Sequence, residues 1–286
     1  MISIIIPTCN RNVLLKECLS NLKPSTQFPA SMSYEVIVTD DSKENTARCL
    51  IEEHFTWVKW MSGPKKGPAA NRNYGANEAN GEWLLFIDDD CLPCNHIINE
   101  YCNAINDRKD VFVFEGCIKA DRPQASFNEE SPVNEIGGYL WSCNVMIQKK
   151  TFCEKLKGFD DNFPYAAMED VDLYYRINKA GLRHTFLSQA YVIHPWRMQK
   201  KPYSTTMKRF KSTLYYLRKY PEKASEINSL YYLKAFYTGF LKDVLNNLFK
   251  YRFNGLFSKI IIGSLNLCFS FYLLFYKTRK NAKFKE

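Results

Sequence analysis

The sequence predicts an α/β fold in which helices flank a mostly parallel β-sheet, followed by a helical and basic C-terminal region. Short β-branched runs alternate with segments of helical spacing, a pattern typical of parallel strands joined by right-handed crossovers. Polar or acidic side chains follow several of these runs directly. Hydrophobic residues make up 46% of the 286 residues, which is enough for a large core and argues against a disordered chain.

The first part of the chain alternates predicted strands and helices. The strands cover residues 2–7, 34–39, 58–61 and 82–87, and the helices cover residues 10–22, 46–54 and 69–80. Ligands of such sheets bind beyond the carboxyl ends of the strands. We therefore expect the polar residues after the strands to meet at one edge of the sheet, namely Thr8, Asn10, Asp41 and Asp88 to Asp90.

The pattern is less regular after residue 95. Further strands are predicted at residues 111–118, 142–148 and 191–194, and further helices at residues 149–155 and 169–180. The polar, proline-bearing stretch between residues 120 and 137 is expected to form a mobile loop.

The triplet Asp88-Asp89-Asp90 follows a hydrophobic run and is a candidate metal site. Adjacent carboxylates repel one another, and a bound cation relieves that repulsion. Carboxylate oxygens suit Mg²⁺ or Mn²⁺, which bind through one or two carboxylates together with substrate phosphates. The alternative is a solvated acidic turn, and the triplet alone does not decide between them.

Seven short motifs occur in one order along the chain. They are residues 7–11 (PTCNR), 38–42 (VTDDS), 67–73 (GPAANRN), 86–90 (FIDDD), 158–160 (GFD), 169–173 (EDVDL) and His194. This ordered set resembles the motifs of family 2 glycosyltransferases over about residues 2–196. The resemblance implies a GT-A fold and an inverting transfer of a sugar from a nucleotide sugar, as in bacterial cell-surface polysaccharide synthesis.

The resemblance implies a domain organisation and a donor site. A catalytic domain would cover residues 1–200, with a nucleotide-binding half at 1–95 and an acceptor-binding half at 96–200, before a helical region at 201–286. The nucleotide-sugar site would be lined by Pro7, Thr8, Asn10, Arg11, Asp41, Arg72, Asp88 and Asp89.

Two of these donor-site residues have specific implied roles and specific alternatives. Asp41 would accept a hydrogen bond from a uracil base, although Asp40 and Asp41 also suit helix capping. Arg72, near the start of a predicted helix, would bind the diphosphate, or it is a surface arginine.

The resemblance also implies the metal and catalytic residues. Asp90, Asp88 and His194 would hold Mn²⁺ or Mg²⁺, while the separate roles of Asp88 and Asp89 stay open. Asp170 would be the general base that deprotonates the acceptor hydroxyl, and Glu169 beside it would contact the acceptor. The alternatives are a helix start stabilised by acidic residues for the Glu-Asp pair and a structural histidine for His194.

Tyr139 and Trp141 are candidates for binding the acceptor, because aromatic faces commonly stack on sugar rings. Packing in the core is an equally reasonable interpretation of both residues.

The ten cysteines are unevenly spaced, and several lie in apolar runs. With no secretory signal before the first strand, we interpret them as reduced thiols of a cytosolic protein. Cys91 and Cys94 also have the spacing of a redox or zinc pair, but no second such pair completes a four-ligand set.

The last part of the chain combines basic and apolar residues. Residues 197–286 hold 19 Lys and Arg against 4 Asp and Glu, whereas residues 1–196 hold 20 against 26. Residues 229–249 predict an amphipathic helix, and residues 260–276 carry no charge. Seventeen residues reach roughly 25 Å, less than the roughly 30 Å hydrocarbon core of a bilayer.

This composition favours peripheral association with an anionic membrane at its cytoplasmic face, where a lipid-linked acceptor would be found. A helix packed on the catalytic domain is the alternative, and nucleic acid is not an expected partner.

For the whole chain, the alternatives to a glycosyltransferase are a nucleotidyltransferase of sugar nucleotides and an inactive glycan- or lipid-binding scaffold. The nucleotidyltransferase would normally carry an N-terminal glycine-rich signature, which residues 7–11 lack.

Overall fold

The computed structural model describes residues 1–27 and 32–282, which divide into two compact units. The sheet unit comprises Met1–Asp121, Ser131–Asn162 and Glu169–Pro195. The helical unit comprises Arg122–Glu130, Phe163–Met168 and Trp196–Glu286. The predicted domain boundary at residue 200 and the subdivision at residue 95 stay predictions.

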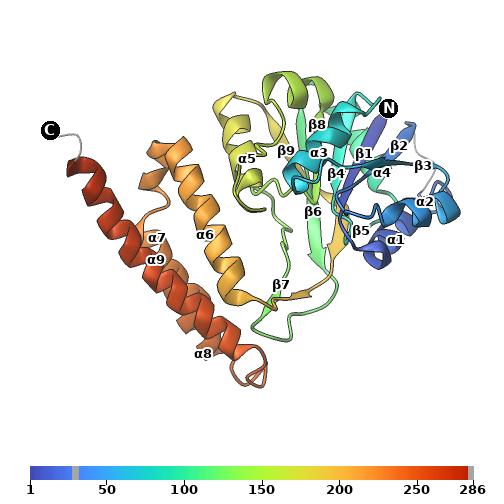
Figure 1. Cartoon of the computed structure of the whole chain (residues 1–286). Helices are drawn as coiled ribbons and strands as arrows, with labels where there is room; N and C mark the ends of the chain where they lie inside the picture. The colour runs from blue at the N-terminus through green and yellow to red at the C-terminus, as the bar shows by residue number, and fades with distance from the viewer. Residues whose placement is uncertain (28–31, 283–286) are drawn as a thin grey trace. The chain divides into compact units, whose positions relative to one another are not determined.

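The sheet unit is built on an eight-stranded sheet of the order β3-β2-β1-β4-β8-β6-β9-β5 within the described residues (Figure 1). The strands are β1 (Ile2–Thr8), β2 (Tyr34–Asp40), β3 (Val58–Ser62), β4 (Trp83–Ile87), β5 (Leu92–Pro93), β6 (Val113–Ala120), β8 (Asn144–Gln148) and β9 (His184–His194). Strands β1 to β4 pair in parallel, and β8 runs antiparallel to β4 and β6. The predicted α/β class, with a GT-A-like sheet, is confirmed.

Helices cover both faces of this sheet, and each face has its own hydrophobic layer. The helices of the sheet unit are α1 (Asn12–Asn21), α2 (Ala47–His54), α3 (Pro68–Asn77), α4 (Ile97–Asp107) and α5 (Glu169–Lys179). Alternate residues of β1 enter opposite layers: Ile4 and Ile6 pack in one and Ile5 in the other. Because both faces of β1 are buried, its sequence is a continuous apolar run.

The register of the parallel strands brings their polar ends together. Thr8 at the end of β1 lies opposite Asp40 of β2, and Ile5 of β1 lies opposite Phe86 of β4. The residues that follow these strands therefore share one edge of the sheet, as the sequence predicts.

Several elements differ from the sequence-based expectation. Helix α4 was not expected, although Ile97, Ile98, Tyr101 and Ile105 have helical spacing and are buried. Strand β9 is longer than expected, and the expected helix at 149–155 is a π-helical turn, Thr151–Lys155. The expected mobile loop at 120–137 includes a short strand, β7 (Glu129–Glu130), and a β-bridge between Ile118 and Asn134.

The helical unit contains α6 (Pro202–Lys219), α7 (Ser229–Phe236), α8 (Asp243–Asn247) and α9 (Leu256–Ala282), with a 3₁₀ turn at Pro221–Ser225. A π-helical stretch, Tyr237–Lys242, joins α7 to α8, so the predicted helix at 229–249 is present in altered form. Helices α7 and α9 pack against each other (Figure 1). Their small core includes Phe210, Tyr232, Phe269 and Leu273, and β7 pairs with β10 (Arg197–Met198).

Helix α9 includes a segment, Leu256–Tyr276, that is long and apolar enough to cross a membrane by length and composition alone. Only 22% of its most apolar stretch is buried by the described residues.

Candidate active site

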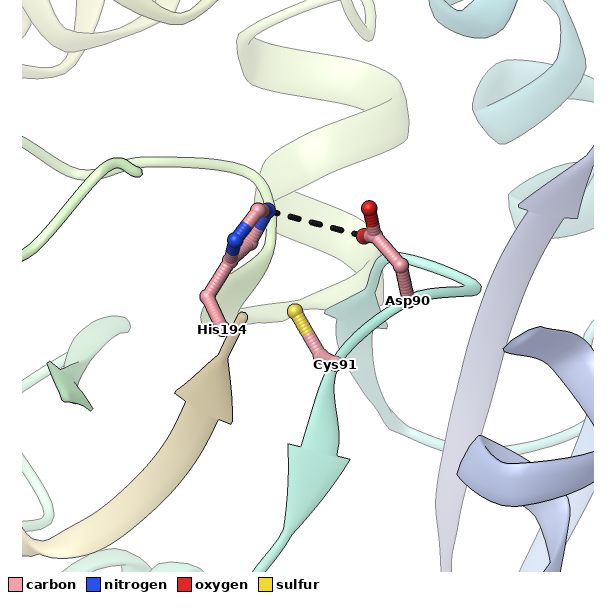
Figure 2. Close-up of side chains that lie close together, drawn as sticks. All are labelled: Asp90, Cys91 and His194. Atoms are coloured by element: carbon pink, nitrogen blue, oxygen red, sulfur yellow. Dashed lines mark ion pairs between the residues drawn. The ribbon is translucent and has the colours of Figure 1, made fainter. Parts of the chain in front are cut away.

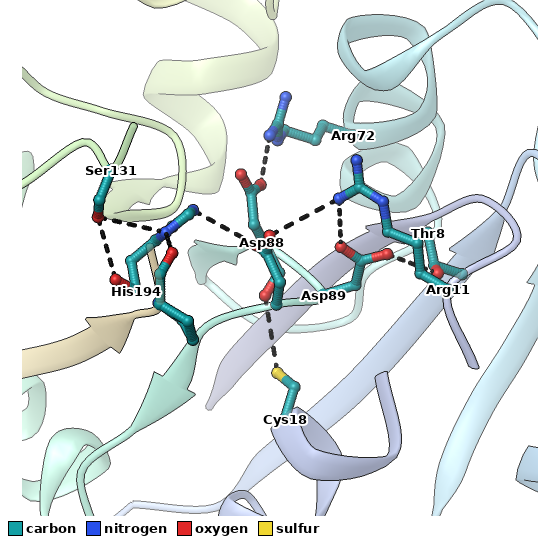
Figure 3. A network of polar contacts seen from close by, with 10 residues as sticks. Thr8, Arg11, Cys18, Arg72, Asp88, Asp89, Ser131 and His194 are labelled. Carbon is teal, nitrogen blue, oxygen red and sulfur yellow. Dashed lines mark hydrogen bonds and ion pairs between the residues drawn. The ribbon is translucent and has the colours of Figure 1, made fainter. Parts of the chain in front are cut away.

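The three aspartates after β4 differ in their partners, and Figure 3 shows those of Asp88 and Asp89. Asp88 forms an ion pair with Arg72 of α3. Asp89 accepts hydrogen bonds from Thr8 Oγ1 at 2.8 Å and from Arg11 Nη1 at 3.0 Å. Asp90 Oδ1 lies 3.5 Å from His194 Nε2, and Asp90 Oδ2 lies 3.8 Å from Arg11 Nη1. The triplet is therefore not a uniform acidic turn, because each carboxylate has a distinct environment.

Asp89 links the end of β4 to the loop after β1. Its side chain is 3% exposed, and both its oxygens are used by Thr8 and Arg11. Burial raises the pKa of Asp89, while the Arg11 charge and the Thr8 hydroxyl act against that rise. This carboxylate fixes the loop that carries Asn10, whose φ of 55° places it in the left-handed region.

Arg72 is a buried cation with unused donors. The residue is 4% exposed, and in the described part of the chain its Nε and Nη1 atoms find no hydrogen-bond partner. Burial works to lower the pKa of Arg72, but Asp88, Asp170 and Glu169 raise it overall. A guanidinium with free N–H groups matches an oxyanion such as a phosphate, and the surface-arginine alternative is wrong.

Glu169 and Asp170 open helix α5 and bring a second pair of carboxylates to this region. Glu169 is 8% exposed, and burial together with the Asp170 charge raises its pKa to about 7. Burial also raises the pKa of Asp170, against the opposing influence of Arg72 and of hydrogen bonding to Ser142. Asp170 as a residue keeps some exposure, yet its Oδ1 atom is buried without a hydrogen-bond partner among the described residues.

The loop before α5 is held by side chains that sequence reasoning missed. Arg176 of α5 donates from Nη1 to the Gly158 carbonyl at 2.9 Å and from Nε to Asp172 at 2.7 Å. Asn73 of α3 accepts from Phe159 N–H at 2.8 Å and donates to the Phe159 carbonyl at 2.8 Å. These contacts tie α5 to α3, the helix that carries Arg72.

Asp90, Cys91 and His194 form a cluster of possible metal ligands (Figure 2). All three are buried, and one donor atom from each lies within 4.8 Å of the others. His194 Nδ1 lies 3.0 Å from the Pro195 carbonyl, which only accepts hydrogen bonds, so Nδ1 carries the proton. The Nε2 lone pair is then available toward Asp90, and burial lowers the pKa of His194, which favours the neutral ring.

This donor set fits a divalent cation. A carboxylate oxygen and a neutral imidazole nitrogen suit Mn²⁺, whereas Mg²⁺ prefers oxygen ligands alone. Asp88 lies on the same turn but contacts Arg72. The sequence singled out Cys91 only as part of a possible redox or zinc pair with Cys94, and the structure groups it with Asp90 and His194 instead.

The two aspartates after β2 behave differently. Asp40 accepts from Ser42 N–H and from Ala47 N–H, both at 2.9 Å, and so caps the start of α2. Asp41 instead accepts from Lys65 N–H at 2.9 Å and Gly67 N–H at 2.8 Å. Capping of α2 therefore applies to Asp40, while Asp41 holds the loop that leads into α3.

Tyr139 and Trp141 lie on a loop held by a buried carboxylate. Their rings stack with centroids 5.7 Å apart and planes 7° apart. Tyr139 is 48% exposed, and Trp141 packs partly on the core. Neither is a fully buried core residue, and Ser142, which hydrogen-bonds with Asp170, follows directly.

The carboxylate that holds this loop belongs to Glu115 of β6, which is 1% exposed. It accepts hydrogen bonds from Asn134 Nδ2 and from the backbone N–H groups of Gly138, Tyr139 and Leu140, at 2.6–2.9 Å. Sequence reasoning missed this role, although a lone acidic residue inside an apolar strand is a signal for a buried, fully satisfied carboxylate.

A protein-family model described as glycosyl transferase family 2 matches residues 3–168 of this chain, more than half of its length. The chain belongs to glycosyl transferase family 2. The matched region includes β1, β4 and the loop with Tyr139 and Trp141, and it ends one residue before Glu169.

Two glycosyltransferases are similar to parts of this chain. Validoxylamine A glucosyltransferase of Streptomyces hygroscopicus subsp. limoneus is 24% identical over 68% of this chain and 51% of its own length. The GalNAc(5)-diNAcBac-PP-undecaprenol beta-1,3-glucosyltransferase of Campylobacter jejuni subsp. jejuni is 31% identical over 31% of this chain and 29% of its own length. The match thus spans about half of the first relative and less of the second.

Two solved structures share the fold of this chain. Staphylococcus aureus TarS 1-349 in complex with UDP has a TM-score of 0.54 at 22% identity, covering 76% of this chain and 65% of that one. The mannosyltransferase PcManGT from Pyrobaculum calidifontis, in complex with GDP-Man and Mn²⁺, has a TM-score of 0.53 at 19% identity, covering 76% and 64%. At these identities the likeness shows the family 2 fold alone.

Proposed function

We propose that this protein is an inverting glycosyltransferase that moves a sugar from a nucleoside-diphosphate sugar, a UDP-sugar, to a hydroxyl of a glycan or lipid-linked acceptor. One observation carries the proposal: Arg72 lies among Asp88, Glu169 and Asp170, residues that come from two distant parts of the chain. An anion-binding guanidinium and a poised carboxylate are what a displacement at a sugar phosphate requires.

The donor would bind at the edge of the sheet where β1, β2 and β4 end. Arg72 would donate its free Nε and Nη1 hydrogens to the diphosphate. Pro7, Thr8, Asn10 and Arg11 would line the nucleotide, with Asp89 holding Thr8 and Arg11 in place. Asp41, whose carboxylate has lone pairs beyond the two used by Lys65 and Gly67, would accept from uracil N–H.

Asp170 would act as the general base. In a single displacement the acceptor oxygen attacks the anomeric carbon as the bond from that carbon to the phosphate oxygen breaks, which inverts the configuration. The acceptor hydroxyl proton passes to the Asp170 carboxylate. Burial raises the pKa of Asp170, and a less acidic carboxylate is a better proton acceptor near neutral pH.

Asp90 and His194, with Asp88 nearby, would hold a divalent cation, Mn²⁺ or Mg²⁺. When bound, such a cation supplies charge neutralisation for the departing diphosphate. His194 contributes by presenting an unprotonated Nε2, which its Nδ1 contact with the Pro195 carbonyl fixes.

The acceptor would lie on the side of Glu169, Tyr139 and Trp141. The exposed stacked ring of Tyr139 offers an apolar face to a sugar, and Glu169 lies next to the base. Two relatives are named as glucosyltransferases acting on an undecaprenol-linked glycan and on poly(ribitol-phosphate), which supports a glycan or lipid-linked acceptor as a class.

The test is nucleotide release from a panel of UDP-sugars and GDP-mannose with and without Mn²⁺. We expect metal-dependent release of UDP from at least one UDP-sugar, and loss of that release in Asp90→Asn. Release that proceeds equally without metal and in the variant would contradict the metal role. Failure of every sugar nucleotide to bind would contradict the proposal itself.

We also propose that the helical unit attaches the protein to an anionic membrane surface at the cytoplasmic face. Helix α9 carries an uncharged exposed stripe at helical spacing, made of Phe257, Ser264, Cys268, Phe271 and Phe275, with Ile260 also exposed. The charge of Lys259 is instead paired with Asp243 at 2.6 Å. Exposed lysines and arginines elsewhere in the unit, such as Lys234, Lys242 and Arg252, suit anionic headgroups.

A further inference from the structure

We propose that Asp90, Cys91 and His194 form a mixed oxygen, sulfur and nitrogen site that binds a thiophilic divalent cation, of the Zn²⁺ class, more tightly than Mn²⁺ or Mg²⁺. The inference rests on the proposed cation position but goes beyond it, because it assigns a ligand role to Cys91 and a metal preference to this chain.

The sheet itself places Cys91 beside His194. Strands β5 and β9 pair antiparallel, with Leu92 opposite Ile193. One step further along this register, Cys91 precedes Leu92 and His194 follows Ile193, so the two residues face each other. The turn is also fixed from the other side, because Cys91 N–H donates to the Asp88 carbonyl at 3.1 Å. Cys91 is fully buried, and its sulfur points toward Asp90 and His194 (Figure 2).

The donor separations suit a small tetrahedral ion. With zinc–ligand bonds of about 2.0–2.3 Å, the ligand atoms of a tetrahedral site lie roughly 3.3–3.7 Å apart. Asp90 Oδ1 and His194 Nε2 are 3.5 Å apart, and all three donors lie within 4.8 Å. A tetrahedral ion held by these three donors would have a fourth position for water or a phosphate oxygen.

The chemistry of the three donors favours zinc over manganese. Thiolate sulfur is a soft ligand that selects Zn²⁺ and related ions, whereas Mg²⁺ and Mn²⁺ prefer carboxylate and water oxygens. Mixed nitrogen and oxygen sites already bind Zn²⁺ more tightly than Mn²⁺. A cysteine in place of a third hard ligand therefore increases the preference of the site for Zn²⁺ over Mn²⁺.

The other cysteine of the Cys91-x-x-Cys94 pair is not part of this site. Cys94 Sγ donates to the Gln189 carbonyl at 3.7 Å, and the metal-competent cluster of the described residues does not include it. Cys91 shares a side-chain hydrogen bond with the buried thiol of Cys143, and the metal-competent cluster groups it with Asp90 and His194. Cys94 provides a matched control, because it is a buried thiol three residues away.

The test compares cation binding to the full-length purified protein and its variants, with UDP absent and present. Stoichiometric Co²⁺ should give a sulfur-to-cobalt charge-transfer band in wild type and in Cys94→Ser but not in Cys91→Ser. Zn²⁺ should displace Mn²⁺, and the electron paramagnetic resonance signal of Mn²⁺ measures that displacement. Cys91→Ser should weaken Zn²⁺ binding at least about tenfold while leaving Mn²⁺ affinity nearly unchanged.

A measurement on the wild type tests the role of Cys91 even if the variant fails to fold. X-ray absorption of the one-to-one zinc complex should show a zinc–sulfur distance of about 2.3 Å. Co²⁺ or Zn²⁺ bound without sulfur, or an unchanged cobalt band in Cys91→Ser, would overturn the role of Cys91 and leave the proposed Asp90 and His194 site intact. Absence of binding by every cation would overturn both the inference and the proposed metal dependence.

Discussion

The guanidinium of Arg72, on helix α3, forms a buried ion pair with Asp88 at the end of β4, and its Nε and Nη1 nitrogens have no hydrogen-bond partner among the described residues. Leaving donors of a buried guanidinium unsatisfied is costly. Such a cost is typical of a site that is completed by a ligand. The ligand that suits these groups is the diphosphate of a nucleotide sugar.

Arg72→Lys tests this relationship directly. Lysine keeps the positive charge beside Asp88 but lacks the fork of donors that a phosphate accepts. We expect UDP affinity to fall about tenfold, since a hydrogen bond to a charged group contributes about 1.5–3 kcal/mol. Isothermal titration with UDP and with uridine separates the diphosphate contribution, because uridine binding should change little. The exposed Arg48→Lys is the control, and unchanged UDP affinity in Arg72→Lys would contradict the role.

Glu169→Gln should alter the pH dependence of stability. The pKa of Glu169 rises from an ordinary 4.5 to about 7 on folding, so the folded state holds the proton more tightly than the unfolded state. Stability therefore falls as pH rises from about 4.5 to about 7, by up to about 3 kcal/mol, and then levels.

Urea unfolding at pH 5 and pH 8 measures this difference in the absence of substrate. Glu169→Gln removes the titration, so the variant should lose less stability than the wild type between the two pH values. Glu154→Gln, at an exposed position, should behave as the wild type. Equal pH dependence in all three proteins would show that Glu169 ionises normally.

Glu115→Gln should release the loop that carries Tyr139 and Trp141. The Glu115 carboxylate accepts from Asn134 and from three consecutive backbone N–H groups, and an amide cannot accept them all. We expect a loss of about 2–4 kcal/mol in the free energy of unfolding. Donor affinity should hold while the KM for acceptor rises, and the exposed Glu135→Gln in the same loop should change neither. A lower affinity for the donor with an unchanged KM for the acceptor would argue against an acceptor role for this loop.

Substitution of exposed phenylalanines on α9 should reduce membrane binding. Phe271 and Phe275 are 57% and 63% exposed, so Phe271→Asp and Phe275→Asp leave the small core of the helical unit intact. Each buried phenylalanine contributes about 1.5–3 kcal/mol, so the double variant should lose at least about tenfold in binding to anionic vesicles. Co-sedimentation with vesicles containing phosphatidylglycerol measures this loss. Binding that persists in the double variant would contradict attachment through α9.

The sequence predicts the first half of the sheet unit well because its signals are local. Strands β1, β2 and β4 are apolar runs ended by polar residues, and the parallel arrangement brings those ends together. Helix α4 was not predicted, although its buried residues have helical spacing and its signal is therefore also local.

Other features depend on contacts between distant residues and have no local signal. The three neighbours Asp88, Asp89 and Asp90 have the same chemistry in the sequence, yet Arg72, Arg11 and His194 give them different environments. The direction of the Cys91 side chain follows from the pairing of β5 with β9, which joins segments about 100 residues apart. Such relationships need the tertiary structure.

The central claim is that Asp170 deprotonates an acceptor that attacks a bound nucleotide sugar. The most direct measurement is the turnover of Asp170→Asn with its best UDP-sugar and acceptor, together with the dissociation constant of that donor. We expect kcat to fall by about 10²–10⁴ while donor affinity stays at the wild-type value, and the exposed Asp161→Asn to match the wild type in both. Wild-type turnover in Asp170→Asn, or a loss of donor affinity with intact turnover, would contradict the account.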